Sequence, residues 1–239
     1  MIPKLIHYCW FGRGEMPELA IKCIASWHKY MPDWKYKLWN EDNFDVNSVP
    51  YTKEAYEARK FAFVSDYVRL LALQREGGVY FDTDVEVLKP FDSLLNYSAF
   101  AGFEGSKYLP VGTCVMASEA NGQWVNEMLE SYRIRHFVNW DGTYDLTTNV
   151  QYITTLMSRQ GFVQNGEEQK YKDLQVFPIE FFSPRQTTGE YHQTENTYCD
   201  HLGLGSWAEH RSGWKVIVGR MVGQKNMTRI IKLKRKIIG

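Results

Sequence analysis

One stretch, residues 61–89, constrains the fold of this chain more than any other. It begins with a densely apolar run, residues 61–73, which Asp66 and Arg69 interrupt. Apolar positions as dense as these predict a helix inside a domain rather than a one-sided surface helix. Asp66 and Arg69 are three residues apart, so both project from one face of that helix. We therefore expect a buried helix that presents an acidic and a basic side chain together.

A double glycine and a short strand follow this helix. Gly77 and Gly78 suit a helix C-terminus, because glycine tolerates the left-handed conformation that such a turn needs. Residues 79–81 then have strand propensity, and Asp82 and Asp84 come directly after them. In an extended chain alternate side chains share a face, so we expect the two carboxylates to point the same way.

Paired carboxylates at a strand end indicate a cation site. They repel each other unless a positive charge lies between them, and Mg²⁺ or Mn²⁺ takes oxygen ligands while leaving positions open for phosphate oxygens. A solvated turn is the alternative, because a motif this short often arises by chance. The apolar strand, the double glycine and the buried helix before it favour the metal site.

The N-terminal part predicts the opening of a nucleotide-binding α/β sheet. Residues 4–11 form a buried strand, residues 17–30 a helix, and residues 34–39 a second strand, an order that predicts a parallel, right-handed unit. The inner side of the helix is expected to carry Ile21, Ile24, Ala25, Trp27 and His28. Further along, residues 121–137 predict another helix.

Four segments together resemble glycosyltransferase family 32, the DXD sugar transferases of bacterial capsule and O-antigen clusters. They are IPKLIHYCWFG (2–12), SDYVR (65–69), GGVYFDTDVE (77–86) and GSW (205–207). The same motifs are similar to those of the clostridial glucosylating toxins and the yeast initiating mannosyltransferases. The resemblance implies a GT-A-type α/β fold, with a central, mainly parallel sheet flanked by helices.

The resemblance also implies a catalytic set of four residues. Asp66 and Arg69 would hydrogen-bond the sugar and ribose hydroxyls of the donor. Asp82 would contact the ribose and the metal, and Asp84 would be the principal ligand of Mn²⁺ or Mg²⁺. A buried ion pair that only braces the helix is the alternative for Asp66 and Arg69, but desolvating two charges is an expensive way to stabilise a helix.

Three further residues are implied to bind the nucleotide of a UDP-sugar. Trp10 would stack on the uracil ring, with an ordinary core tryptophan as the alternative. Ser206 and Trp207 would donate hydrogen bonds to the β-phosphate and close a lid over the donor.

His201 is implied to complete the metal shell, since a neutral imidazole is a good Mn²⁺ ligand. Asp200 and His210 are near competitors. Many members of the resembled family carry a second histidine directly before this one, whereas this chain has Asp200.

Length and cysteine usage limit the number of domains and the kinds of metal or disulfide site that we expect. A chain of 239 residues suits one large domain. The four cysteines are widely spaced, so the sequence indicates neither a zinc site nor a disulfide framework. No segment is apolar enough to span a membrane, and the N-terminus has no signal-peptide pattern. We expect a bacterial enzyme in the cytoplasm, where it can contact the inner face of the plasma membrane.

Charge is distributed unevenly along the chain. The sequence has 28 basic and 28 acidic side chains, and residues 211–239 hold nine of the basic and none of the acidic ones. We expect a catalytic domain over residues 1–210 and a basic amphipathic helical tail over 211–239. The tail would lie on an anionic membrane or pack on the domain with a solvated basic edge. The acidic body disfavours nucleic acid as a partner.

The reaction that the resemblance implies is transfer of a hexose or N-acetylhexosamine from a UDP-sugar, with retention of configuration. We expect the acceptor to be a lipid-linked oligosaccharide in capsule or O-antigen assembly. The sequence does not reveal a nucleophile; Glu104 and Asp145 are positional guesses, and a front-face mechanism needs none. A metal-dependent phosphohydrolase of sugar nucleotides and a non-catalytic sugar-nucleotide-binding protein are the alternatives.

Overall fold

A seven-stranded sheet runs through the centre of the computed structural model, in the order β2-β1-β3-β6-β5-β8-β7. The structure describes residues 1–105, 109–185 and 191–203. The strands of the sheet are β1 Leu5–Cys9, β2 Lys35–Trp39, β3 Gly78–Phe81, β5 Ala99–Phe103, β6 Val111–Ser118, β7 Gln169–Tyr171 and β8 Leu174–Phe177. A second, two-stranded sheet pairs β4 (Val85–Val87) with β9 (Cys199–His201).

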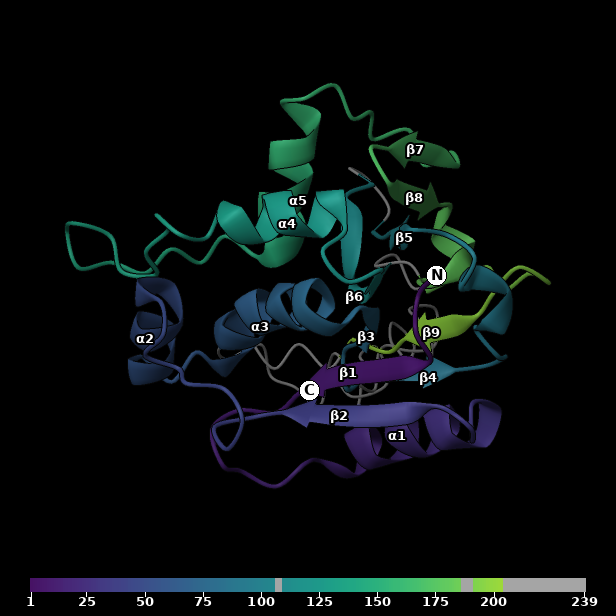
Figure 1. Cartoon of the computed structure of the whole chain (residues 1–239), viewed down its shortest axis with the longest axis horizontal. Coiled ribbons are helices and arrows are strands. Elements are labelled where there is room, and N and C mark those ends of the chain that lie inside the picture. The colour runs from purple at the N-terminus through teal and green to yellow at the C-terminus, as the bar shows by residue number, and fades with distance from the viewer. Residues whose placement is uncertain (106–108, 186–190, 204–239) are drawn as a thin grey trace, which may run out of the picture.

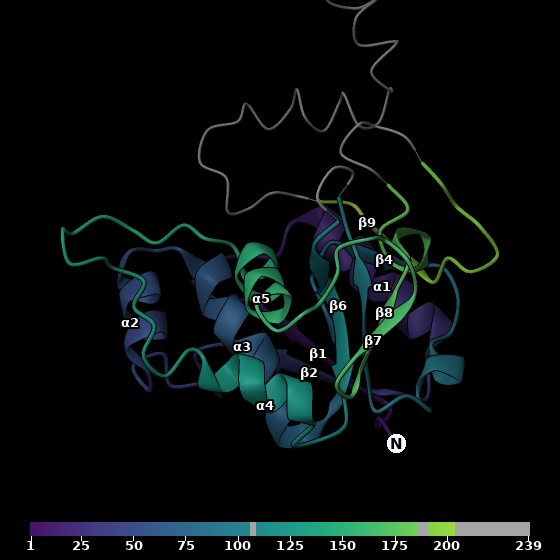
Figure 2. The same ribbon diagram turned by 90° about the horizontal axis from the view of Figure 1, so that it is seen from above.

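Helices cover both faces of the large sheet (Figure 1). Helix α1 (Glu18–Tyr30) and the β4–β9 pair lie on one face, and the other four helices lie on the opposite face, as the view from above also shows (Figure 2). Those four are α2 Pro50–Glu57, α3 Phe61–Glu76, α4 Gln123–Glu130 and α5 Asn149–Ser158. Two short 3₁₀ helices span Asp92–Leu94 and Ile179–Phe181.

Strand direction brings distant residues to one edge of the sheet. Strands β1 and β2, β1 and β3, and β5 and β8 are parallel, whereas β6 and β7 run against their neighbours. Five of the seven strands therefore point the same way, and the predicted mainly parallel α/β sheet is confirmed. The carboxyl ends of β1, β3 and β5 meet at one edge, together with the amino end of β6. Ligands of open α/β sheets bind outside this kind of edge.

The sheet separates two hydrophobic cores. One lies beneath α2–α5 and is rich in aromatic rings, such as Tyr51, Tyr67 and Tyr132. The other lies between the sheet, α1 and the β4–β9 pair, where Trp27 is fully buried and its indole donates to the carbonyl of Val85 at 2.7 Å. Strands β3, β5 and β6 are buried along their whole length, because each face of the sheet is covered.

The predicted buried helix and glycine turn are confirmed. Ten residues of α3 between Phe63 and Leu73 are buried, and the helix ends at Glu76. Gly77 follows with a φ of 64°, and Gly78 opens β3 with a φ of 111°. Both angles are in the left-handed region that favours glycine.

Gly78 is also a point of close backbone approach, and this leads to a stability prediction. A Cβ atom at Gly78 would lie 2.4 Å from the carbonyl oxygen of Leu5, whereas one at Gly14 would have nothing within 4 Å. We expect Gly78→Ala to lower the free energy of unfolding by about 3 kcal/mol or more, from steric conflict and backbone strain together. Gly14→Ala is the matched control, and urea denaturation compares the two. Equal losses of unfolding free energy in the two variants would show that the close approach of Gly78 to Leu5 does not require glycine.

Two predicted details are wrong. Helix α1 buries Ala20, Cys23 and Trp27, whereas the predicted inner residue Ile21 is 57% exposed. Ala25 and His28 are exposed as well, whereas Trp27 is buried as predicted. The face toward β4 includes Trp27, which bonds the carbonyl of Val85, and Ser26, whose hydroxyl accepts from the N–H of Val87 at 2.9 Å. Helix α4 ends at Glu130 rather than near residue 137, and turns follow it.

The predicted tail, residues 211–239, lies outside the described residues, as does the boundary at residue 210. Both stay predictions. Within the described ranges, no helix is long and apolar enough to cross a bilayer.

Candidate active site

The two aspartates of the D-x-D motif lie where β3 ends. The backbone N–H of Asp82 donates to the carbonyl of Cys114 in β6 at 2.9 Å, which fixes the exit of the strand. The N–H of Val85 then donates to the carbonyl of Asp82 at 3.1 Å, so Thr83 and Asp84 form a tight turn. The expected extended conformation is therefore wrong. The two carboxylates still approach each other, because the turn folds Asp84 back beside Asp82.

Arg69 joins the buried helix to this turn. Its Nη2 atom lies 3.1 Å from the Asp66 carboxylate and 3.2 Å from the Asp82 carboxylate. Its Nη1 atom donates to the carbonyl and the hydroxyl of Thr113 at 2.7 and 3.1 Å. The guanidinium is thus held by groups from α3, from β6 and from the turn after β3, and one cation is shared between two carboxylates.

Asp66 is the less well compensated of these two carboxylates. The residue is 8% exposed, and its own backbone carbonyl accepts from the Asn149 side chain at 3.3 Å. Burial raises the pKa of Asp66 to about 6, against the opposing effect of Arg69. A carboxyl group titrating near neutral pH inside a site is typical of residues kept for binding or catalysis rather than for stability.

Pairing of β4 with β9 places His201 against the D-x-D turn. Val85 is the register partner of His201, and the N–H of Leu202 donates to the carbonyl of Asp84 at 3.0 Å. The imidazole Nε2 lies 3.4 Å from the Asp84 carboxylate. Burial lowers the pKa of His201, but Cys114 and the Asp84 carboxylate outweigh burial and raise it well above the ordinary value.

The two competitors of His201 have other positions. Asp200 is 2% exposed and is bound by Arg185, whose guanidinium donates to its carboxylate at 2.7 Å. Neighbouring residues of a strand face opposite sides, so Asp200 points away from the side that His201 faces. His210 lies outside the described residues.

Asp82, Asp84 and His201 offer one ligand atom each, and these three atoms lie within 4.8 Å of one another. Two carboxylates and one imidazole match the preferences of Mn²⁺, and with less advantage those of Mg²⁺, which favours oxygen ligands alone. The donor set therefore fits the divalent metal that the sequence predicted.

The predicted nucleotide contacts are placed only in part. Trp10 follows β1 at the same edge of the sheet; its indole N–H donates to the carbonyl of Gly14 at 2.6 Å, and the side chain is half-buried. Its stacking on a base stays a prediction. Ser206 and Trp207 lie outside the described residues.

The geometry separates the two positional guesses for a nucleophile. Glu104 directly follows β5 and has its carboxylate within 4.8 Å of the ligand atoms of Cys114 and His201. Asp145 is instead paired with Arg135 at 2.9 Å, beside the loop that leads into α5. Of the two carboxylates, Glu104 is the one beside the D-x-D turn.

Tyr80 is a site residue that the sequence did not reveal, since a tyrosine in an apolar strand predicts only a core residue. Its hydroxyl donates to the Asp82 carboxylate at 2.9 Å, and its ring lies 4.7 Å from the Arg69 guanidinium. The aromatic ring fills the core, and the hydroxyl orients the first aspartate of the motif.

Removing this hydroxyl is expected to weaken the site with little change in fold. A hydrogen bond to a charged group contributes about 1.5–3 kcal/mol, so Tyr80→Phe should lower kcat/KM for the sugar donor that the sequence predicts roughly tenfold or more. Tyr152→Phe is the matched control, because Tyr152 donates to the carbonyl of Ser131 at 3.2 Å. Equal losses in both variants would contradict a role for Tyr80 in the site.

Comparison with known proteins agrees with this geometry. A sheet with a D-x-D turn at the carboxyl end of a buried strand, beside a helix that supplies Asp66 and Arg69, defines a GT-A-type glycosyltransferase fold. Residues 17–101 match the model of the family described as "Glycosyltransferase sugar-binding region containing DXD motif", a range that includes α3 and the D-x-D turn.

Similar proteins come from fungi and bacteria. Glucan organizing enzyme 1 of Cryptococcus neoformans is 29% identical over 97% of this chain and 69% of its own length. Inositol phosphoceramide mannosyltransferase 3 of Schizosaccharomyces pombe is 32% identical over 41% of this chain, which corresponds to 29% of the relative. The solved structure of the PaToxG glycosyltransferase has a TM-score of 0.53 at 18% identity, over 67% of this chain and 70% of that one, and so shares the fold.

Proposed function

We propose that this protein transfers a hexose or N-acetylhexosamine from a nucleoside diphosphate sugar to an acceptor hydroxyl, with retention of configuration. The observation that carries the proposal is the convergence of Asp82, Asp84 and His201 within 4.8 Å of one another, beside the Asp66–Arg69 pair. A phosphohydrolase would use the same carboxylates but has no need of a sugar-reading helix next to them.

In this proposal Asp82, Asp84 and His201 would hold Mn²⁺ or Mg²⁺. When bound, such an ion supplies Lewis-acid stabilisation of negative charge on the departing diphosphate. Asp66 reads hydroxyl groups of the donor sugar, and Arg69 holds Asp66 and Asp82 at a constant spacing.

The nucleotide and the sugar are the first points to test. The sequence resemblance favours a UDP-sugar, with Trp10 on the uracil ring, whereas the names of the S. pombe relatives favour a mannosyl donor. A thermal-shift panel of UDP- and GDP-sugars, each with and without Mn²⁺, decides between them. Binding to the folded state at a hundredfold excess over Kd stabilises it by about 2.7 kcal/mol.

Three outcomes of this panel are distinct. Stabilisation by UDP-sugars only with Mn²⁺ supports the proposal as stated. Stabilisation by GDP-mannose alone overturns the uridine assignment and leaves the transferase intact. If no nucleotide sugar shifts the melting temperature, the transferase proposal is wrong. A separate assay of nucleotide release tests the phosphohydrolase alternative: release without acceptor as fast as with it would also overturn the proposal.

The proposed acceptor is a lipid-linked oligosaccharide, with capsule or O-antigen assembly in the cytoplasm of a bacterium as its setting. The resemblance to capsule and O-antigen transferases supports this setting. A relative named for inositol phosphoceramide supports an acceptor carried on a lipid. The basic residues of 211–239 would then face the anionic membrane surface. Co-sedimentation with anionic vesicles, and its loss when residues 211–239 are removed, tests the contact.

A further inference from the structure

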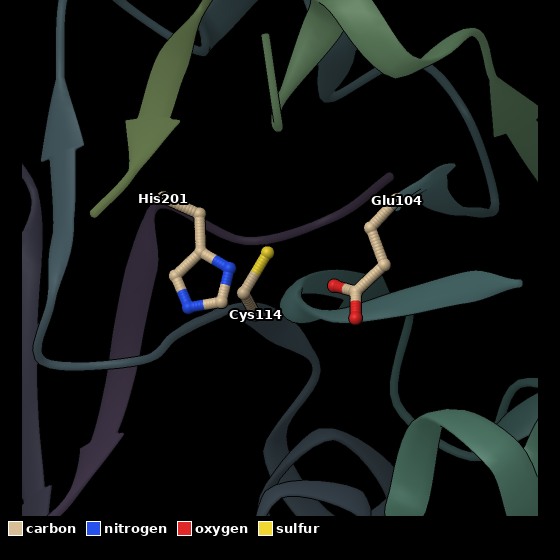
Figure 3. Close-up of side chains that lie close together, drawn as sticks. All are labelled: Glu104, Cys114 and His201. Atoms are coloured by element: carbon tan, nitrogen blue, oxygen red, sulfur yellow. The ribbon is translucent and has the colours of Figure 1, made fainter. Parts of the chain in front are cut away.

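A second group of metal-ligating side chains lies beside the D-x-D turn. Glu104 follows β5, Cys114 lies in β6 and His201 ends β9, and their ligand atoms lie within 4.8 Å of one another. In Figure 3 the imidazole and the carboxylate lie on either side of the thiol. His201 belongs to this group and to the group formed with Asp82 and Asp84.

Burial makes this second group more than a chance cluster. Cys114 is 2% exposed, and its sulfur has a serine hydroxyl, that of Ser183, 3.7 Å away. Glu104 has a carboxylate oxygen, Oε2, that is buried and makes no hydrogen bond within the described residues. Gly112 leaves room for it, since a Cβ at that position would lie 2.9 Å from the same oxygen. A buried, unsatisfied carboxylate is costly and is commonly a sign of a bound ion.

The donor chemistry selects a different metal from that of the D-x-D site. A thiolate, an imidazole and a carboxylate are ligands that Zn²⁺ accepts in tetrahedral geometry, with a fourth position for water. Mg²⁺ and Mn²⁺ prefer oxygen and gain little from sulfur. We propose that Glu104, Cys114 and His201 form a zinc site that competes with the D-x-D site for His201.

The competition follows from the chemistry of imidazole. A neutral histidine has one nitrogen with a lone pair and one that carries a proton, so His201 ligates one metal at a time. Zinc in the second site therefore removes the imidazole from Asp82 and Asp84. On the proposed function, which this step requires, Zn²⁺ inhibits transfer and raising Mn²⁺ relieves the inhibition. Zinc binding itself does not require that function.

Cobalt is the probe for the site, because a Co²⁺–thiolate bond has a charge-transfer band in the near ultraviolet. We expect the full chain to show this band with Co²⁺, and Zn²⁺ to abolish it. Cys114→Ser should lose the band, whereas Cys9→Ser, which replaces another buried cysteine, should keep it. A wild-type protein with no band, or a band that survives in Cys114→Ser, would overturn the proposal.

A second variant decides the matter if Cys114→Ser does not fold. Glu104→Gln keeps the shape of the side chain and should weaken Zn²⁺ binding at least about tenfold, with Mn²⁺ binding in the D-x-D site unchanged. If Glu104→Gln weakens the binding of both metals equally, or of neither, the result counts against a separate site. If the wild-type protein did not bind nucleotide with Mn²⁺, the proposed function would be contradicted. The cobalt band would still report on the zinc site.

Discussion

Asp84→Asn is expected to lower the rate of sugar transfer at saturating donor by about a thousandfold or more. The substitution keeps the size of the side chain but removes the charge that a divalent metal requires, and losing electrostatic stabilisation of a leaving diphosphate has effects of this order. The rise in melting temperature caused by Mn²⁺ with nucleotide should disappear as well, which separates lost binding from lost folding.

Asp141→Asn is the matched control for this experiment. Asp141 is exposed in the loop before α5, where it accepts a hydrogen bond from Thr143 at 2.7 Å. Its substitution should leave transfer unchanged. If Asp84→Asn retained activity within tenfold of the wild type, the D-x-D turn would not hold the metal and the proposed mechanism would be abandoned.

Asp66→Asn is expected to stabilise the fold at pH 8 while reducing activity. The pKa of Asp66 is about 6 in the folded state, against an ordinary value of 3.8, because burial opposes its ionisation. The folded state therefore holds this proton more tightly than the unfolded state, and stability falls as pH rises from about 4 through 6. The difference between these two pKa values corresponds to roughly 3 kcal/mol. Asparagine resembles the protonated form, so the gain should approach this value at pH 8 and vanish near pH 4.

The loss of activity in the same variant has a separate cause. If Asp66 accepts hydrogen bonds from the donor sugar, replacing its charge should lower kcat/KM roughly tenfold to a hundredfold. Urea denaturation across pH measures the stability, and a transfer assay measures the activity. A variant that is less stable than the wild type at pH 8 would show that Arg69 compensates Asp66 more fully than the pKa indicates.

Asp145→Asn provides a control of opposite sign. Burial acts to raise the pKa of Asp145, but hydrogen bonds from Thr147 and Arg135 outweigh it and lower the pKa below the ordinary value. Its ionised form is the one that stabilises the folded state, and this contribution is lost as pH falls. The substitution should therefore destabilise the protein at pH 8, where Asp66→Asn stabilises it.

Local sequence was sufficient for the helix, the glycine turn and the strand that carry the D-x-D motif. Dense apolar positions made α3 a buried helix, and the three-residue spacing of Asp66 and Arg69 put them on one face at 3.1 Å. Both features depend on neighbours within a few residues, so periodicity alone determines them. The sequence likewise predicted that Asp82 and Asp84 act as a pair. It did not predict the turn that brings their carboxylates together.

Tertiary structure decided which distant groups complete the site. His201 reaches Asp84 only because β9 pairs with β4, and Glu104 and Cys114 reach His201 only because of the directions of β5 and β6. The face that α1 buries was decided in the same way, by its contact with β4. Pairing between strands more than a hundred residues apart depends on the free energy of the whole sheet. No periodicity within a single segment carries that information. The aspartates followed from the local pattern and His201 from the family resemblance, whereas the position of Cys114 and Glu104 beside His201 is seen only in the tertiary structure.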